Sequence, residues 1–149
     1  MNHLARQVKF DYWANLESLH AIERAKIDSP ASKIVSHIAA VSELWLARLE
    51  KSSPSLKIWP ELSTKAIEEI FRDQRRRWLV ICETNSAEMP VQYISSAKGE
   101  CVNNLGEVIQ EVALHGAHHR GQIALLLRSH GADPPASTDF IPALRDGRF

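Results

Sequence analysis

Apolar side chains recur every three or four positions along most of the chain. Four stretches carry this spacing, at residues 2–26, 30–51, 63–85 and 104–130, and each is long enough for several helical turns. A period of 3.6 residues predicts amphipathic helices that bury one face. Four such helices in 149 residues predict an all-α fold, a four-helix bundle that forms one domain over residues 1–149.

Residues at the predicted helix ends support these boundaries. Ser29 and Pro30 are predicted as the N-cap and the first residue of the second helix. Asn104, followed three residues later by Glu107, is typical of a capping box that opens the last helix. Gly131 is predicted to follow the end of that helix, because glycine readily adopts the left-handed conformation required there.

The segment before the last helix has a different period. Its sequence, VQYISSAKGECV at residues 91–102, alternates apolar and polar side chains and offers Lys98-Gly99 as a tight turn. We therefore expect a short β-hairpin between the third and fourth long helices. Beyond the last helix, three apolar side chains of the tail are expected to pack back onto the helices: Phe140, Ile141 and Leu144.

The balance of charge argues against nucleic-acid binding. Lys and Arg total 18 and Asp and Glu total 18, so the formal charge is zero and the usual basic excess of such proteins is missing. One basic cluster occurs in the third predicted helix. It consists of Arg72, Arg75, Arg76 and Arg77. Arg72 and Arg77 each stand four residues after an acidic residue, and this i, i+4 spacing indicates a solvated helix face rather than a binding surface.

Hydropathy and cysteine content predict the cellular compartment of the protein. The longest runs without a polar residue, such as residues 123–127, are five residues long, against the roughly 20 needed to span a bilayer. The first residues also lack the apolar region of a secretory signal. Two cysteines, Cys82 and Cys101, are too few for a disulfide framework and fit a reducing compartment. We therefore expect a cytoplasmic protein that binds no membrane.

Three histidines stand on the predicted apolar stripes. His115 and His119 lie four residues apart in the last helix, so their side chains share one face. His37 lies in the second helix, three residues after Ile34 and four before Val41. Inward imidazoles from two helices are expected to meet in the bundle, where metal sites of this fold are built. Imidazole suits Zn, Ni, Fe or Cu, and three protein ligands leave an open coordination position, as in catalytic sites.

The same histidines could instead be core residues held by hydrogen bonds. Burying polar groups without partners costs about 1–3 kcal/mol for each group, however, and metal binding removes that cost. His118 is turned about 100° from His119 and is expected at the rim. Gln122 could bond a metal-bound water or a facing helix. Glu111, one turn before His115, could accept a hydrogen bond or act as a general base, and a solvated position is the alternative.

Two glycines lie close to the histidine pair of the last helix, one just after His115 and one two residues after His119. A glycine inside a helix costs about 0.5–1 kcal/mol relative to alanine. Gly116 and Gly121 therefore predict that another helix, the hairpin or a substrate approaches this part of the helix closely. Arg120, between them, is expected at a contact between helices, with a carboxylate as a possible partner.

Two motifs resemble the DinB/YfiT family. The second helix carries His37 followed by the pattern xxxVxxxWLxRL, and the last helix carries HxxxHRGQI at residues 115–123. YWAN at residues 12–15 is a weaker similarity, and the resemblance covers about residues 4–147. It implies a four-helix bundle, usually a homodimer, that holds a metal ion, typically Zn or Ni, by the matching histidines, His37, His115 and His119.

The resemblance also implies a reaction class. Relatives include transferases that move substrates onto low-molecular-weight thiols such as bacillithiol, and a mycothiol-dependent isomerase. We therefore expect a divalent-metal-dependent enzyme of the thiol S-transferase type that acts on a small-molecule substrate, with a low-molecular-weight thiol as cosubstrate. One alternative is a hydrolase that uses metal-bound hydroxide on the same ligands. Another is a non-catalytic metal-binding stress-response protein, in which a fourth ligand such as Glu111 or His118 closes the coordination sphere.

Overall fold

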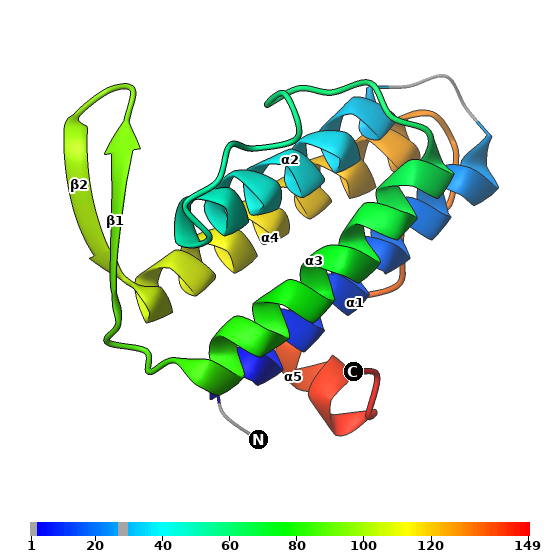
Figure 1. Ribbon diagram of the computed structural model, residues 1–149. Coiled ribbons are helices and arrows are strands. Elements are labelled where there is room, and N and C mark those ends of the chain that lie inside the picture. Colours follow the sequence, from blue (N-terminus) through cyan, green and yellow to red (C-terminus); the bar gives the residue numbers. More distant parts are fainter. Residues whose placement is uncertain (1–2, 27–29) are drawn as a thin grey trace.

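The computed structural model describes residues 3–26 and 30–149. Within these ranges the fold is mostly helical, as predicted, with one antiparallel two-stranded sheet. None of the described helices combines the length and the apolar character that a bilayer span requires. In chain order the elements are α1 (His3–Ala25), α2 (Ala31–Leu49), α3 (Thr64–Thr84), β1 (Pro90–Ser95), β2 (Gly99–Asn104), α4 (Leu105–Ser129) and α5 (Phe140–Arg145) (Figure 1).

The ends of the helices follow local sequence signals. The predicted capping box opens α4: the Glu107 N–H donates to Asn104 Oδ1 over 2.8 Å, and the Asn104 N–H donates to Glu107 Oε2 over 3.0 Å. Gly131 follows α4 with φ +72°, as predicted. Pro30 is the N-cap of α2 rather than its first helical residue, because its carbonyl already accepts hydrogen bonds from the first turn. The predicted cap Ser29 lies outside the described residues.

The predicted β-hairpin is present and stands at one end of the helices (Figure 1). Ser95 pairs with Gly99 at its turn, and Gly99 adopts φ +76°, a conformation that glycine reaches without strain. The second strand is longer than predicted and runs directly into α4. Tyr93 packs edge-to-face on Trp45 of α2, with ring centroids 4.9 Å apart. The hairpin is thereby attached to the helix that also carries His37.

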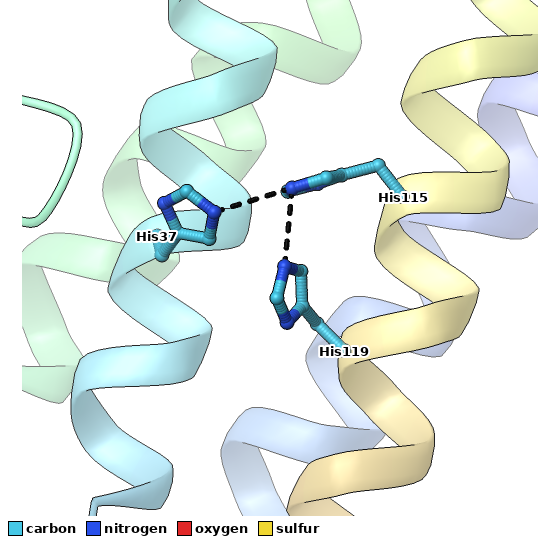
Figure 2. Close-up of side chains that lie close together, drawn as sticks. All are labelled: His37, His115 and His119. Carbon is cyan, nitrogen blue, oxygen red and sulfur yellow. Dashed lines mark hydrogen bonds between the residues drawn. The ribbon is translucent and has the colours of Figure 1, made fainter.

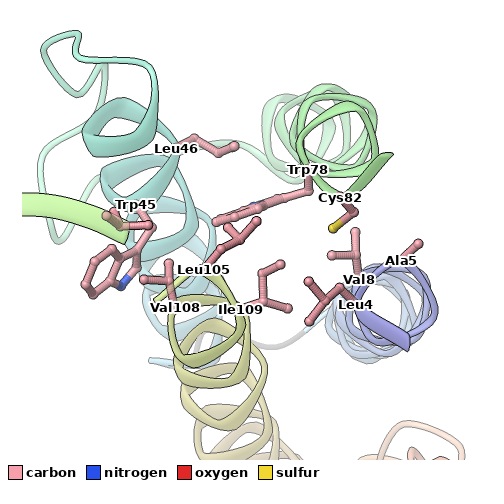
Figure 3. Close-up of a cluster of buried hydrophobic side chains, with 11 residues drawn as sticks. Leu4, Ala5, Val8, Trp45, Leu46, Trp78, Cys82, Leu105, Val108 and Ile109 are labelled. Carbon is pink, nitrogen blue, oxygen red and sulfur yellow. The ribbon is translucent and has the colours of Figure 1, made fainter. Parts of the chain in front are cut away.

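Two apolar clusters fill the interior between the four long helices, and each of these helices contributes to both. α1 and α2 each contact α3 and α4. The cluster nearer the hairpin contains Leu4, Ala5, Val8, Trp45, Leu46, Trp78, Cys82, Val91, Leu105, Val108 and Ile109 (Figure 3). The cluster at the opposite end contains Leu19, Ala21, Ile22, Ala31, Val35, Ile38, Ala39, Ile67, Phe71, Ile123 and Leu127.

Buried polar side chains lie between these two clusters. On each long helix, one or two buried polar positions fall between the residues that belong to one cluster and those that belong to the other. Internal hydrogen bonds link them to one another and to neighbouring groups; the Trp78 indole, for example, donates to Ser42 Oγ over 3.0 Å. Such buried networks favour one register of the helices over others. We call this set the polar layer: Asp11, Asn15, Ser42, Gln74 and Arg120.

One arginine of the basic cluster departs from the prediction. Arg72 pairs with Glu68 along α3, as expected. Arg77 keeps its i, i+4 contact with Asp73 over 3.3 Å, but its guanidinium also lies 2.8 Å from Glu43 of α2 and 2.5 Å from Glu50 at the C-cap of α2, and its side chain is only 18% exposed. The prediction of a solvated face is therefore wrong for Arg77. Arg77 lies on the side of α3 that faces α2, which the i, i+4 pattern within α3 could not show.

The C-terminal tail packs back onto α1, but with different residues from those predicted. The Phe140 ring lies edge-on to Phe10, with centroids 5.0 Å apart, and Ala143 is buried beside it. Ile141 and Leu144 are 58% and 37% exposed, so their predicted packing is wrong. Because α5 has only six residues, positions 140 and 143 share its inner side and positions 141 and 144 face outward.

The two cysteines differ sharply in environment, which gives a first prediction. Cys82 is 1% exposed, and burial raises the pKa of its thiol to about 11. Cys101 on β2 is partly exposed. Since the thiolate is the reactive form, a thiol reagent at pH 8 is expected to label one cysteine per native chain and two after denaturation. Mass spectrometry of the labelled peptides identifies the site. Labelling of Cys82 in the native protein at the rate of Cys101 would contradict the structure.

Candidate metal centre

The structure brings together the three histidines singled out in the sequence. His37 projects from α2, and His115 and His119 project from α4 (Figure 2). The Nε2 atom of His115 lies 3.2 Å from Nε2 of His37 and 3.1 Å from Nε2 of His119. The ligand atoms of all three lie within 4.8 Å of one another. A single ion could therefore contact all three rings.

The pair on α4 lies at the edge of the buried face, not at its centre. The centre of that face passes through Gly116, Arg120 and Ile123, which are buried. His115 and His119 each precede one of these positions by one residue, a rotation of about 100°, and both are only partly buried. The two histidines therefore lie beside the core stripe, on its solvent side, and not on the stripe as predicted. This shift leaves His115 and His119 partly exposed to solvent.

Hydrogen bonds at the far nitrogens orient two of the rings. His37 Nδ1 lies 2.7 Å from the backbone oxygen of Ile58, and His119 Nδ1 lies 2.7 Å from Oε1 of Gln122. Because a carbonyl oxygen only accepts, each Nδ1 carries a proton, so the tautomer with a single proton presents a bare Nε2 toward His115. His115 has one Nε2 proton at most, too few to satisfy both facing lone pairs. A cation at this point resolves the mismatch.

Distances and protonation both fit a bound ion. Tetrahedral Zn–N bonds of about 2.0–2.1 Å place neighbouring ligand nitrogens roughly 3.3 Å apart, close to the observed 3.1 and 3.2 Å. Burial and the neighbouring histidines lower the pKa of His115 from 6.5 to about 4, and burial also lowers the pKa of His119. Both rings are therefore neutral near pH 7, which is the form that binds metal ions.

An aromatic side chain from the α2–α3 loop covers His37. The Trp59 indole stacks on this imidazole with ring centroids 3.7 Å apart and planes 6° from parallel, yet it remains 57% exposed. Its neighbour Ile58 supplies the carbonyl that holds His37 Nδ1. No periodic signal in the sequence ties Trp59, a loop residue, to a ring 22 positions away. The structure makes it one wall of the cluster.

A family comparison agrees with this geometry. The DinB family model matches residues 14–143, a stretch that contains all three histidines. The chain belongs to the DinB family. No curated protein and no solved structure matches the chain.

Two polar residues beside the centre of this DinB-family chain have clear positions. Gln122 contacts His119 through Oε1, and its Nε2 lies 3.1 Å from Nε2 of His118. His118 is exposed at the rim, as predicted. Glu111 makes no hydrogen bond or ion pair with the cluster in the described part of the chain; it is exposed and lines a separate pocket. Gln122 therefore orients a histidine, whereas Glu111 does not.

The residue after His119 anchors α4 to α1. Arg120 is buried, and its Nη1 lies 2.6 Å from Asp11 Oδ1 and 2.6 Å from Asn15 Oδ1. Arg120 thus makes the predicted contact between helices, and its partner is the predicted carboxylate. Burial raises the pKa of Asp11, and the charge of Arg120 opposes that effect. The ion pair fixes the rotation of α4 that presents His119 and His115 toward α2.

The two glycines of α4 have opposite surroundings. A Cβ on Gly116 would lie 2.7 Å from both Arg120 Nη1 and Asp11 Oδ1, so the predicted close approach is correct there. Around Gly121, apart from its chain neighbours and the backbone of its own helix, no atom of the described chain lies within 4 Å of such a Cβ, so the predicted approach of another helix or of the hairpin is wrong for that position. Gly116 leaves room for the buried ion pair, whereas Gly121 has no neighbour that requires it.

These surroundings predict opposite effects of alanine. Gly121→Ala is expected to raise the free energy of unfolding by about 0.5–1 kcal/mol, the helix-propensity gain without a clash. Gly116→Ala is expected to lower it by about 1–3 kcal/mol, because the ion pair must move to make room. Urea unfolding of the two variants beside the wild type measures both values. A stabilising Gly116→Ala would show that the space beside Asp11 is not limiting.

Proposed function

We propose that this protein is a divalent-metal-dependent enzyme of the thiol S-transferase type. Zn or Ni would be held by His37, His115 and His119, and a low-molecular-weight thiol would be the cosubstrate. The observation that carries the proposal is the convergence of three Nε2 atoms, two of them on rings whose Nδ1 is already held. When bound, the metal supplies a Lewis acid that favours the thiolate form of a thiol.

The chain's own residues prepare the site for a substrate. The Ile58 carbonyl and the Gln122 amide fix the orientation of two imidazoles before any ion arrives, which lowers the entropic cost of forming the site. Trp59 supplies an exposed aromatic wall against which a substrate can stack. Among the described residues, the converging group has three members and no fourth protein ligand. Three ligands and an accessible side are typical of catalytic rather than structural sites.

Assembly and organisation are part of the same proposal. We propose one domain over residues 1–149, a four-helix bundle made by α1 to α4, and a cytoplasmic homodimer. Packing of α1 and α2 against both α3 and α4 supports the bundle. Exposed Leu114 and Leu125 on α4, beside the open position Gly121, support a contact between copies. Light scattering should give twice the chain mass of 16.8 kDa, and a monomer at micromolar concentration would remove the dimer from the proposal.

The activity is tested with defined thiols. Zn- or Ni-loaded protein is incubated with bacillithiol, mycothiol or cysteine and with an alkylating electrophile, and the thioether product is quantified by mass spectrometry. We expect product formation that requires the metal, saturates with one thiol and disappears in His115→Ala. Turnover of ester substrates without any thiol would instead identify a hydrolase. Metal binding with neither activity would support a non-catalytic metal-binding protein.

A further inference from the structure

A pocket separate from the histidine cluster lies on the same two helices, α2 and α4, nearer the hairpin. Glu111 of this pocket is one helical turn before His115, about 6 Å along α4. Trp45 is two turns after His37, about 12 Å along α2. Pocket and cluster therefore lie side by side along the same pair of helices. This hairpin-side pocket measures about 390 Å³ and is lined by Trp45, Tyr93, Asn103, Glu107, Val108 and Glu111.

The aromatic wall of this pocket already attracts a cation. Trp45 and Tyr93 meet edge-to-face at 4.9 Å. The guanidinium carbon of Arg48 lies 4.4 Å from the Trp45 ring centroid and 4.5 Å from that of Tyr93. Aromatic faces at these distances stabilise positive charge through the ring quadrupole. The pair thus forms a surface suited to a cationic group, of which Arg48 uses one side.

Two carboxylates supply the opposing charge. Glu107 and Glu111 stand at i and i+4 on α4, where like charges repel. Glu107 is held in place, because its Oε2 accepts from the Asn104 N–H and from Asn103 Nδ2, each over 3.0 Å. No lysine or arginine of the described residues forms an ion pair with either carboxylate. Against the single charge of Arg48, the pocket keeps an excess of negative charge.

The chemistry of the lining favours an organic cation over a metal ion. In the described chain, the side chains that converge closely enough to hold a metal are the three histidines, and neither glutamate belongs to that group. Aromatic rings beside carboxylates are typical of sites for alkylammonium groups. We propose that the hairpin-side pocket binds a primary ammonium group on the molecule that reacts at the histidine cluster. This substrate class rests on the proposed function.

Matched thiol probes test the proposal in zinc-loaded protein. 6-Aminohexane-1-thiol carries an ammonium group at the end of a chain long enough to leave the histidine cluster, and 6-hydroxyhexane-1-thiol is its neutral counterpart. The amine is expected to bind about tenfold more tightly, through the two carboxylates and the aromatic wall. In Glu111→Gln the ratio should fall toward one, while zinc binding and the affinity for the hydroxyl probe stay unchanged. Glu100→Gln, an exposed glutamate on β2 outside the pocket, should keep the full ratio.

A second readout separates the pocket from the metal chemistry. Hexylamine is titrated into metal-free protein, and the indole N–H resonance of Trp45 is followed by NMR. We expect a saturable shift that weakens at least threefold in Glu111→Gln and persists in His119→Ala. If zinc or thiols fail to bind, the proposed function is wrong. The hexylamine titration still shows whether the hairpin-side pocket binds an ammonium group. Equal affinities of the two thiols, or an unchanged Trp45 resonance, would overturn the inference.

Discussion

Replacing Arg120 with methionine is expected to lower the free energy of unfolding by about 3–5 kcal/mol. The change removes the guanidinium that lies 2.6 Å from Asp11 and leaves that carboxylate buried without its counter-charge. Asn15 alone cannot replace the lost charge, although it donates to Asp11 over 2.9 Å. Urea unfolding followed by circular dichroism measures the difference.

The matched control is an arginine on the same helix that faces solvent. Arg128→Met should change the free energy of unfolding by less than about 0.5 kcal/mol, since Arg128 is exposed. The double variant Asp11→Leu/Arg120→Met should lose less stability than Arg120→Met alone, because no buried charge remains. If the single and double variants are equally destabilised, the cost arises from lost packing and not from an unpaired carboxylate.

Replacing His119 with alanine is expected to reduce bound metal from about one ion per chain to almost none. The variant keeps His37 and His115, but two imidazoles bind a divalent ion far more weakly than three. Elemental analysis of untagged protein, purified without added metal, gives the stoichiometry. His118→Ala is the matched control, because this exposed neighbour lies outside the converging group and its loss should leave the metal content unchanged.

The same variant should keep its fold. The two apolar clusters lie at either end of the helices and do not include the histidines. His119→Ala and the metal-free wild type are therefore both expected to unfold in one cooperative transition. A metal-free protein that melts without cooperativity would make the ion structural. Equal metal content in wild type, His119→Ala and His118→Ala would rule out the histidine centre itself.

Features encoded within a few residues were predicted correctly. The four long helices follow from apolar periodicity, and their ends follow from groups that bond within one turn, as the Asn104 and Glu107 capping box shows. The hairpin follows from alternation around Gly99. The spacing of His115 and His119 places both on one helical face whatever the rest of the chain does. The prediction that His37 joins them needed only the same inward placement on a second helix.

The wrong predictions concern the rotation of a helix about its own axis, which decides the direction in which each face points. The apolar stripe of α4 is compatible with an axis through the histidines or through Arg120, one position away. The structure selects Arg120, because Asp11 and Asn15 on α1 complete its hydrogen bonds in the polar layer. The same choice moves His119 to the edge of the core and leaves Gly121 open. Periodicity fixes which residues share a face, but the partner helix fixes where that face points.

The sequence by itself determined the four long helices, both ends of α4, the hairpin and the three candidate ligands, since hydrogen bonds and helical geometry within a few residues specify them. Only the tertiary structure decided which atoms surround those ligands. The Ile58 carbonyl and the Trp59 ring reach His37 from a loop about 20 positions away, and Tyr93 meets Trp45 from the hairpin. Such contacts depend on how separate elements pack, because no local interaction ties a loop or strand residue to a distant helix.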